Sequence, residues 1–219
     1  MITVIIKDDG EPRVVELTYS NLWRELKDIP DSQLIVAKNW LEALPDVKNR
    51  YVCFVEADCL VSSGYFTSQL GLYKKSPFMR KLAVMGSSTA INHWHNRIYG
   101  YSLGNSFSDG VVPIREKKSR TPYPVQVAYI PGALVHTEML KQLLETIKPH
   151  PTWQDDLQFF STQLSLGFWR QGVGNGVGNR VHLNPSATYV TTEEYVNNLG
   201  NFDTGCEDLV EMFKKQVIS

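Results

Sequence analysis

Two acidic residues follow a run of apolar residues in the segment RYVCFVEADCLVSSGYF, and they are the strongest chemical signal in the sequence. The run Tyr51 to Val55 is β-branched and aromatic, which is typical of a strand covered on both faces in a parallel sheet. The period of two in a strand predicts that Glu56 and Asp58 point to the same side. Paired carboxylates beyond the carboxyl end of such a strand suit Mg²⁺ or Mn²⁺ together with a diphosphate. Alternatively, the acids only end the strand at the surface, with Asp58 capping the next segment.

A second acidic pair, Asp155 and Asp156, lies in the segment HPTWQDDLQFFSTQLSLGF. Apolar residues recur there at helical spacing and predict a helix from about Gln154 to Leu166. The pair falls in the first turn, where the helix dipole favours negative charge, so both acids have a structural explanation. The functional alternative is that one aspartate is a general base, which takes a proton from an attacking hydroxyl.

Strands alternate with helices around these acids, which favours an α/β sheet with at least a parallel centre. The predicted strands are Ile2 to Ile6, Leu34 to Ala37, Tyr51 to Val55, Leu82 to Met85, Val125 to Ile130 and Val181 to Val190. The predicted helices are Tyr19 to Lys27, Asn39 to Val47, Ser63 to Tyr73, Glu138 to Ile147, Gln154 to Leu166 and Glu207 to Val217. Arg13 to Leu17 either pairs back as a hairpin or leads into the first helix. Residues 86 to 123 are expected to form a long loop region with short strands.

The composition is that of a globular protein, with 42% apolar and 21% charged residues among 219. No linker is evident, so we expect a single domain over residues 1 to 219. The net charge of -1 argues against wholesale electrostatic capture of nucleic acid. The three cysteines favour reduced thiols in a cytoplasmic protein. The first apolar run is too short for a signal peptide, and no run is long enough for a membrane helix, so the sequence predicts a soluble protein.

The order of these motifs resembles the GT-A glycosyltransferases, particularly those of the family 2 type. Glu56-Ala57-Asp58 stands where that family has its Asp-x-Asp metal motif, and Asp155-Asp156 stands at its Glu-Asp position. Gly132-Ala133, within PGALVHTEML, is similar to the family's segment under the acceptor site. Gly167-Phe168 matches the glycine that ends the family's acidic helix, and Asn39 matches the Asn of its Ala-Arg-Asn helix start. The resemblance covers roughly residues 33 to 190.

The resemblance implies a GT-A-like, Rossmann-type mixed sheet, parallel at its centre and flanked by helices. It implies that Asp58 coordinates Mn²⁺ or Mg²⁺ on the donor diphosphate, that Glu56 assists, and that Asp156 is the base of an inverting displacement. Asp155 is the neighbouring candidate for the catalytic role. Asp8, Asp9 and Lys38 follow the first two predicted strands and are candidates for donor contact. His182, at the start of the last predicted strand, is a candidate for a further metal ligand.

The predicted function is therefore metal-dependent transfer of a sugar from a nucleotide-sugar donor to an acceptor hydroxyl on a glycan, a protein or a modified nucleic acid. The alternatives are a metal-dependent nucleotidyltransferase or phosphohydrolase, and a non-catalytic nucleotide-sugar-binding domain. The sequence also contains a basic cluster, formed by Arg115, Lys117, Lys118 and Arg120. Such a cluster is either a solvated loop or a contact for the donor diphosphate or an anionic acceptor.

Overall fold

The computed structural model describes residues 1–8, 10–75, 81–90, 97–104, 111–148, 156–173, 180–197 and 202–217. Most of its strands belong to one eight-stranded mixed sheet. These strands are β1 (Ile2–Lys7), β2 (Gln33–Ala37), β3 (Tyr51–Glu56), β4 (Cys59–Val61), β5 (Val84–Ala90), β8 (Tyr123–Pro124), β9 (Leu134–His136) and β10 (Val181–Thr191). A separate two-stranded sheet is formed by β6 (Tyr101–Leu103) and β7 (Val111–Pro113).

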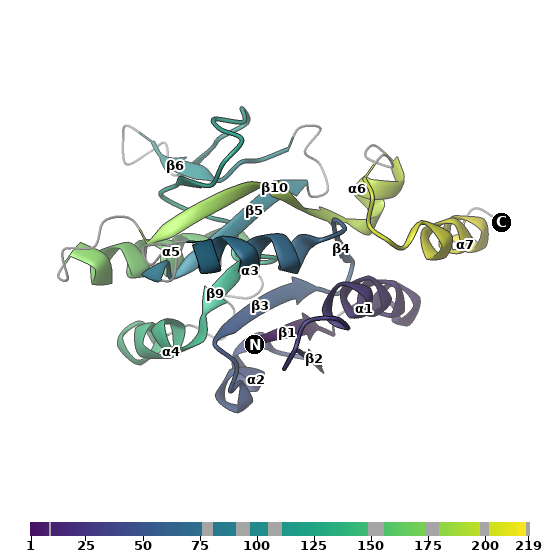
Figure 1. Cartoon of the computed structure of the whole chain (residues 1–219), viewed down its shortest axis with the longest axis horizontal. Coiled ribbons are helices and arrows are strands. Elements are labelled where there is room, and N and C mark those ends of the chain that lie inside the picture. The colour runs from purple at the N-terminus through teal and green to yellow at the C-terminus, as the bar shows by residue number, and fades with distance from the viewer. Residues whose placement is uncertain are drawn as a thin grey trace.

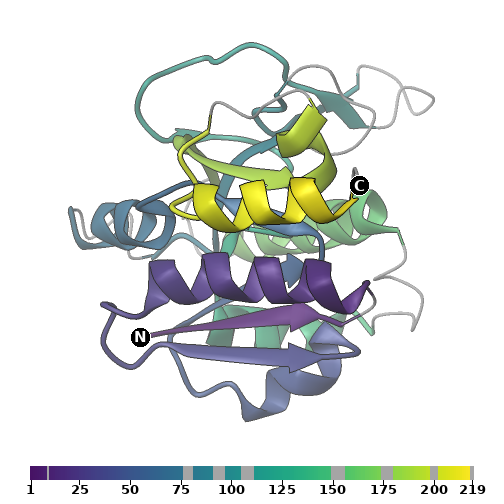
Figure 2. The same cartoon turned by 90° about the vertical axis from the view of Figure 1, so that its right-hand side faces the viewer.

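Helices cover both faces of the large sheet (Figure 1). They are α1 (Pro12–Leu26), α2 (Trp40–Ala43) with the 3₁₀ turn η1 (Leu44–Asp46), α3 (Tyr65–Lys75), α4 (Thr137–Thr146), α5 (Leu157–Val173), α6 (Thr192–Asn197) and α7 (Glu207–Val217). One core layer packs α1 and α3 against the sheet, and a second layer packs α2, α4 and α5 against the other face. Figure 2 shows α1 and α2 on opposite sides of β1 and β2.

The order of strands along the sheet is β2-β1-β3-β9-β5-β10-β4, and β8 pairs with β10 outside this path. The first three of these strands are parallel to one another. β9 is antiparallel to both of its neighbours, β3 and β5, so β5 runs in the direction of β3, and β10 is parallel to β5. The predicted α/β class, with a mixed and mostly parallel sheet flanked by helices, is confirmed.

The continuous apolar pattern of the central strands follows from this double coverage. Alternate residues of a strand point to opposite faces. In β1, Val4 belongs to the layer under α1 and α3, while its neighbour Ile5 belongs to the layer under α2, α4 and α5. Cys53 and Phe54 of β3 divide in the same way, and all four side chains are fully buried.

The prediction of a strand over Val125 to Ile130 is wrong. In this stretch only Val127 forms a bridge, to Tyr101, and the strand of the sheet is β9, a few residues later. The backbone amides of Ala128 and Ile130 donate to serine hydroxyls of α5 and not to a neighbouring strand. Amides that are bonded to side chains cannot extend a ladder, although all residues of this stretch except Gln126 are buried as in a strand.

Several other boundaries differ from the prediction. The hairpin alternative for Arg13 to Leu17 does not form, because α1 begins at Pro12, a residue that suits the first position of a helix. β5 extends to Ala90 into the predicted loop region. The helix expected to end at Gly167-Phe168 continues to Val173. Gly167 lies inside α5, where a Cβ would come within 2.6 Å of the Ile147 side chain that follows α4.

None of the described helices is both long and apolar enough to span a membrane. All three cysteines carry free, buried thiols, as the odd cysteine count predicts. Asn39 begins the helix expected there, since its side-chain oxygen accepts hydrogen bonds from the amides of Leu41 and Glu42 at 2.9 and 3.2 Å.

Candidate functional site

Three parallel strands end in a row at the same end of the sheet, which we call the carboxyl end. Lys7, the last residue of β1, is in register with Ala37 at the end of β2 and with Glu56 at the end of β3. The residues that follow are therefore neighbours in space. Asp8 and Lys38 are exposed there, and the amide of Asp8 donates to the carbonyl of Ala37 at 2.8 Å. Asp9 lies outside the described residues.

Glu56 and Asp58 are separated by the end of the strand. β3 ends at Glu56, and Ala57 and Asp58 form a turn that leads into β4. The period of two in a strand therefore does not determine the direction of the Asp58 side chain, contrary to the sequence argument. The turn is fixed through its backbone: the Ala57 carbonyl accepts a hydrogen bond from the Thr18 hydroxyl at 2.5 Å, and the Asp58 carbonyl accepts one from the Thr192 amide at 2.6 Å.

The two carboxylates nevertheless come together around one thiol. The Cys59 Sγ lies 3.5 Å from Oδ1 of Asp58 and 3.9 Å from Oε2 of Glu56. Burial, reinforced by the charges of Glu56 and Asp58, raises the pKa of the Cys59 thiol well above its usual value. The thiol therefore stays protonated and donates to the carboxylates. The side chain of Asp58 is exposed and that of Glu56 is partly buried, so the pair opens to solvent on the Asp58 side.

Two buried tyrosines hold the Glu56 carboxylate. The hydroxyls of Tyr129 and Tyr189 each donate to Oε2 of Glu56 at 3.2 Å. The Tyr189 oxygen also accepts the backbone N–H of Glu56 at 3.1 Å. Burial is the main cause that raises the pKa of both tyrosine hydroxyls well above the usual value, with further contributions from Glu56 and Cys59. Both hydroxyls are therefore neutral donors throughout the physiological pH range.

The tyrosines are positioned by close backbone contacts. Ser161 and Ser165 of α5 bind the amides on either side of Tyr129, and so fix its place against the helix. Gly132 donates its amide to the carbonyl of Phe54 at 2.7 Å and has φ of 77°. A Cβ at Gly132 would lie 2.5 Å from the Tyr189 ring, so only glycine allows this approach. Sequence reasoning missed both tyrosines, since they are 73 and 133 positions from Glu56 and stand in no motif.

Asp156 is brought to the same end of the sheet. It is the residue before α5, and its Oδ1 accepts the amide of Phe159 at 2.8 Å, so it is the N-cap and does not belong to the first turn. One turn later, the Phe160 ring packs against Phe54 of β3 with centroids 6.4 Å apart. Phe54 is two residues from Glu56, so the start of α5 lies toward the carboxyl end of β3. Asp156 is exposed there, and Asp155 lies outside the described residues.

His182 lies apart from the acidic pair. It is the second residue of β10, whereas Tyr189, which contacts Glu56, is seven positions later in the same strand. An irregularity in β10 between Asn184 and Thr188 takes up part of this length, because the partners of His182 and Tyr189 on β5, Met85 and Thr89, are only four positions apart. A strand advances about 3.3 Å per residue, so His182 lies about 13 Å along the sheet from Tyr189. It is 6% exposed, and burial lowers its pKa. Within the described ranges, no three His, Cys, Asp or Glu side chains gather closely enough to hold a metal ion by themselves.

Comparison with known proteins identifies the fold. No protein-family model matches the sequence, and no curated protein matches it significantly. Among solved structures, a fragment of S. aureus TarS, residues 1–349, matches with a TM-score of 0.53 and 10% identity over 95% of this chain and 68% of that one. The same fragment in complex with UDP-GlcNAc matches with a TM-score of 0.49 and 9% identity over 95% and 70% of the two chains. A second TarS structure gives 0.48 and 11% identity, and this chain spans 42% of it.

TarS is a glycosyltransferase with a GT-A-like fold. At this level of identity, the likeness to the first TarS fragment shows the architecture alone: the chain has a mixed α/β fold similar to that of a glycosyltransferase structure.

Proposed function

We propose that this chain transfers a sugar from a nucleotide-sugar donor to an acceptor hydroxyl, with Mn²⁺ or Mg²⁺ bound at Glu56 and Asp58. The observation that carries the proposal is the pair of carboxylates at the carboxyl end of β3, gathered around Cys59, in a chain whose fold is similar to that of a glycosyltransferase structure. In open α/β sheets, ligands bind beyond this end of the strands. Asp8 follows β1, which pairs with β3, and Lys38 follows β2, the next strand along the sheet; both are proposed to contact the donor.

The acidic pair fits a hard divalent cation. Carboxylate oxygens are the ligands that Mg²⁺ and Mn²⁺ prefer, and such ions are commonly held by one or two carboxylates together with substrate phosphates. Asp58 is exposed and directs the pair toward solvent, while the tyrosines fix Glu56 from the protein side. When bound, the metal would neutralise charge on the donor diphosphate. His182 is not part of this proposed site.

The proposed reaction is an inverting displacement. The acceptor oxygen attacks the anomeric carbon of the donor sugar, its proton passes to the Asp156 carboxylate, and the bond between that carbon and the diphosphate breaks. The electron pair of this bond leaves with the diphosphate, so a nucleoside diphosphate is released. The proposed role of Asp156 is supported by its exposed position at the start of α5, where the amide of Phe159 holds its side chain. Positioning and charge stabilisation, with the proton transfer, supply the catalysis.

The acceptor is proposed to be a glycan, a protein or a modified nucleic acid. The four cations of the basic cluster, Arg115, Lys117, Lys118 and Arg120, are all exposed in the segment after β7, which leaves them accessible to an anionic acceptor or to the donor diphosphate.

A thermal-shift screen of nucleoside diphosphate sugars, with and without Mn²⁺, tests the proposal. A donor at about 100 times its Kd stabilises the native state by about 2.7 kcal/mol, which corresponds to roughly 5–10 °C for a chain of this size. We expect this shift only when donor and Mn²⁺ are present together. Product analysis then separates the enzyme classes. Release of pyrophosphate would identify a nucleotidyltransferase, and the absence of any donor binding would contradict the proposal.

The tyrosine pair gives a second prediction. Tyr129→Phe and Tyr189→Phe remove the hydroxyls that orient Glu56, so each is expected to weaken Mn²⁺ binding about 10- to 100-fold, the usual effect of losing a partner of a metal ligand. Tyr189→Phe should also lower the free energy of unfolding by about 1–2 kcal/mol, because the Glu56 amide loses its acceptor. Mn²⁺ titration and urea denaturation measure the two effects.

The matched control is Tyr123→Phe. The Tyr123 hydroxyl donates to the carbonyl of Tyr99 at 3.1 Å, and Tyr123 belongs to β8, which pairs with the amino-terminal half of β10. This variant should lose stability without losing metal affinity. If Tyr129→Phe and Tyr189→Phe both bind Mn²⁺ as tightly as the wild type, the two tyrosines have a structural role only.

A further inference from the structure

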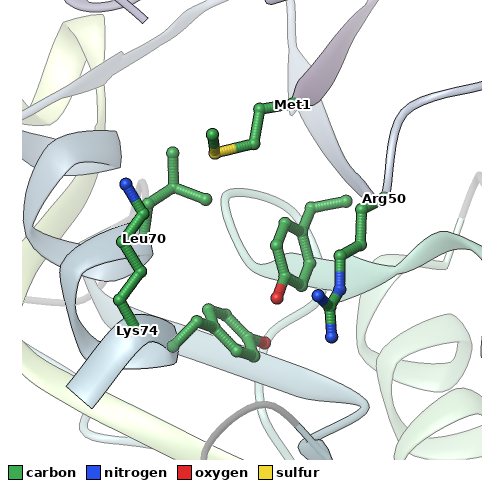
Figure 3. A pocket seen from close by; sticks show the side chains of 6 residues that line it. Met1, Arg50, Leu70 and Lys74 are labelled. Atoms are coloured by element: carbon green, nitrogen blue, oxygen red, sulfur yellow. The ribbon is translucent and has the colours of Figure 1, made fainter. Parts of the chain in front are cut away.

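A cavity lies at the opposite end of the sheet from the acidic pair. It is about 240 Å³ in volume and is lined by Met1, Arg50, Tyr51, Leu70, Tyr73 and Lys74 (Figure 3). Met1 precedes β1, Arg50 and Tyr51 stand at the start of β3, and the other three residues come from the second half of α3. Tyr51 and Glu56 are the first and last residues of β3, so about 16 Å of strand separates the cavity from the candidate active site.

The walls of the cavity are fixed before any ligand arrives. The rings of Tyr51 and Tyr73 pack at 4.5 Å between centroids, and both residues are almost fully buried. The Tyr73 hydroxyl donates to the carbonyl of Leu134 at 3.4 Å. The backbone beside Met1 is fixed as well, because the side-chain amide of Asn49 donates to the carbonyl of Ile2 at 3.0 Å. A preformed cavity avoids much of the entropic cost of ordering a binding site.

The chemistry of the lining is an apolar interior with cations at its sides. Met1, Leu70 and the two tyrosine rings supply the apolar surface, and none of the six lining residues is acidic. Arg50 and Lys74 are exposed and extend from opposite sides of the cavity (Figure 3). The guanidinium of Arg50 lies 5.4 Å from the centroid of the Tyr51 ring, so a cation and an aromatic face are presented together.

The volume limits the size of a ligand. Cavities that take drug-sized molecules measure about 300–1,000 Å³, and this one is smaller. A single ring or a short branched chain is the apolar group that fits. Two positive side chains lie at the rim and the lining contains no acid, so we expect a ligand that carries a negative charge beside its apolar group. A guanidinium binds a carboxylate in a planar, bidentate contact.

We propose that this cavity is a binding site for a small organic carboxylate whose apolar part is one aromatic ring. The ring occupies the space between Met1, Leu70 and the tyrosine rings, and the carboxylate pairs with Arg50, with Lys74 as the second cation. The site is separate from the proposed transfer reaction, so it is testable whether or not that proposal holds.

Phenylacetate is the probe, and phenylacetamide is its uncharged isostere. In amide-detected NMR titrations of the whole chain, phenylacetate is expected to shift the signals of Tyr51, Leu70 and Lys74. Phenylacetamide should shift the same signals with about 10-fold lower affinity, since a hydrogen bond to a charged group is lost. Arg50→Gln should lower the affinity for phenylacetate to that for the amide. Lys48→Gln, which removes an exposed cation outside the lining, should leave both affinities unchanged.

A second variant tests the space itself. Leu70→Trp fills the cavity and should abolish binding of both probes. Arg50→Gln alters an exposed side chain, so it tests the proposal even if Leu70→Trp does not fold. The proposal is overturned if phenylacetate at millimolar concentrations leaves the signals of the lining residues unshifted. It is equally overturned if the acid and the amide bind alike, or if Arg50→Gln binds phenylacetate as the wild type does.

Discussion

Asp58→Asn is expected to abolish Mn²⁺-dependent donor binding and to lower turnover about 10³-fold. The exposed carboxylate of Asp58 is the ligand of the proposed metal that faces solvent and the donor. Metal stabilisation of a departing diphosphate is worth several kcal/mol, and about 4 kcal/mol corresponds to this loss in rate. The fold should survive, because the contact that fixes the turn is made by the backbone carbonyl of Asp58, which Asn retains. Turnover assays, Mn²⁺ titration and thermal denaturation measure the three properties.

Asp46→Asn is the matched control. Asp46 is also an exposed aspartate, but it lies in η1 before the start of β3, at the other end of the strand. Its replacement should leave turnover and Mn²⁺ binding unchanged. Normal turnover of Asp58→Asn at saturating Mn²⁺ would remove Asp58 from the metal site, and with it the metal dependence proposed for this chain.

The fold was largely predictable because its central strands are covered on both faces. Double coverage makes β1 and β3 continuously apolar, and that pattern is visible without any structure. The same reasoning failed at Val125 to Ile130. That stretch is also apolar and buried except at Gln126, but the amides of Ala128 and Ile130 are bonded to Ser165 and Ser161. Hydrophobicity indicates burial, and it does not indicate which partner a backbone amide will find.

The candidate site was predictable only where its residues are close in sequence. Glu56 and Asp58 stand two positions apart, and the structure gathers them, although by a turn and not by the period of a strand. Tyr189 reaches Glu56 only through the order of strands in the folded sheet, and Tyr129 only through the packing of its irregular stretch against α5. His182 shows the reverse error. It was predicted at the start of the last strand and proposed as a metal ligand. It does lie at the amino-terminal end of β10, but the strand separates it from the acids.

Asp156→Asn distinguishes between capping and catalysis, because asparagine retains one role and loses the other. The structure shows Asp156 capping α5, with Oδ1 accepting the Phe159 amide at 2.8 Å. Asn is about as good an N-cap as Asp, so the free energy of unfolding should hardly change. A carboxamide cannot take a proton, so kcat should fall about 10²–10⁴-fold if Asp156 is the general base. Donor and Mn²⁺ binding should remain, since both are assigned to the strand ends.

Asp156→Ala and Asp155→Asn complete the experiment. Alanine removes the cap as well, and should cost about 1 kcal/mol of stability in addition to the loss in kcat. If Asp156 only caps the helix, Asp156→Asn will turn over at nearly the rate of the wild type, and alanine will affect stability alone. A greater loss of kcat at Asp155 than at Asp156 would place the base one residue earlier. Little loss at either position would remove the reason for proposing an inverting displacement, and the acidic pair at Glu56 and Asp58 would then be the only support for catalysis.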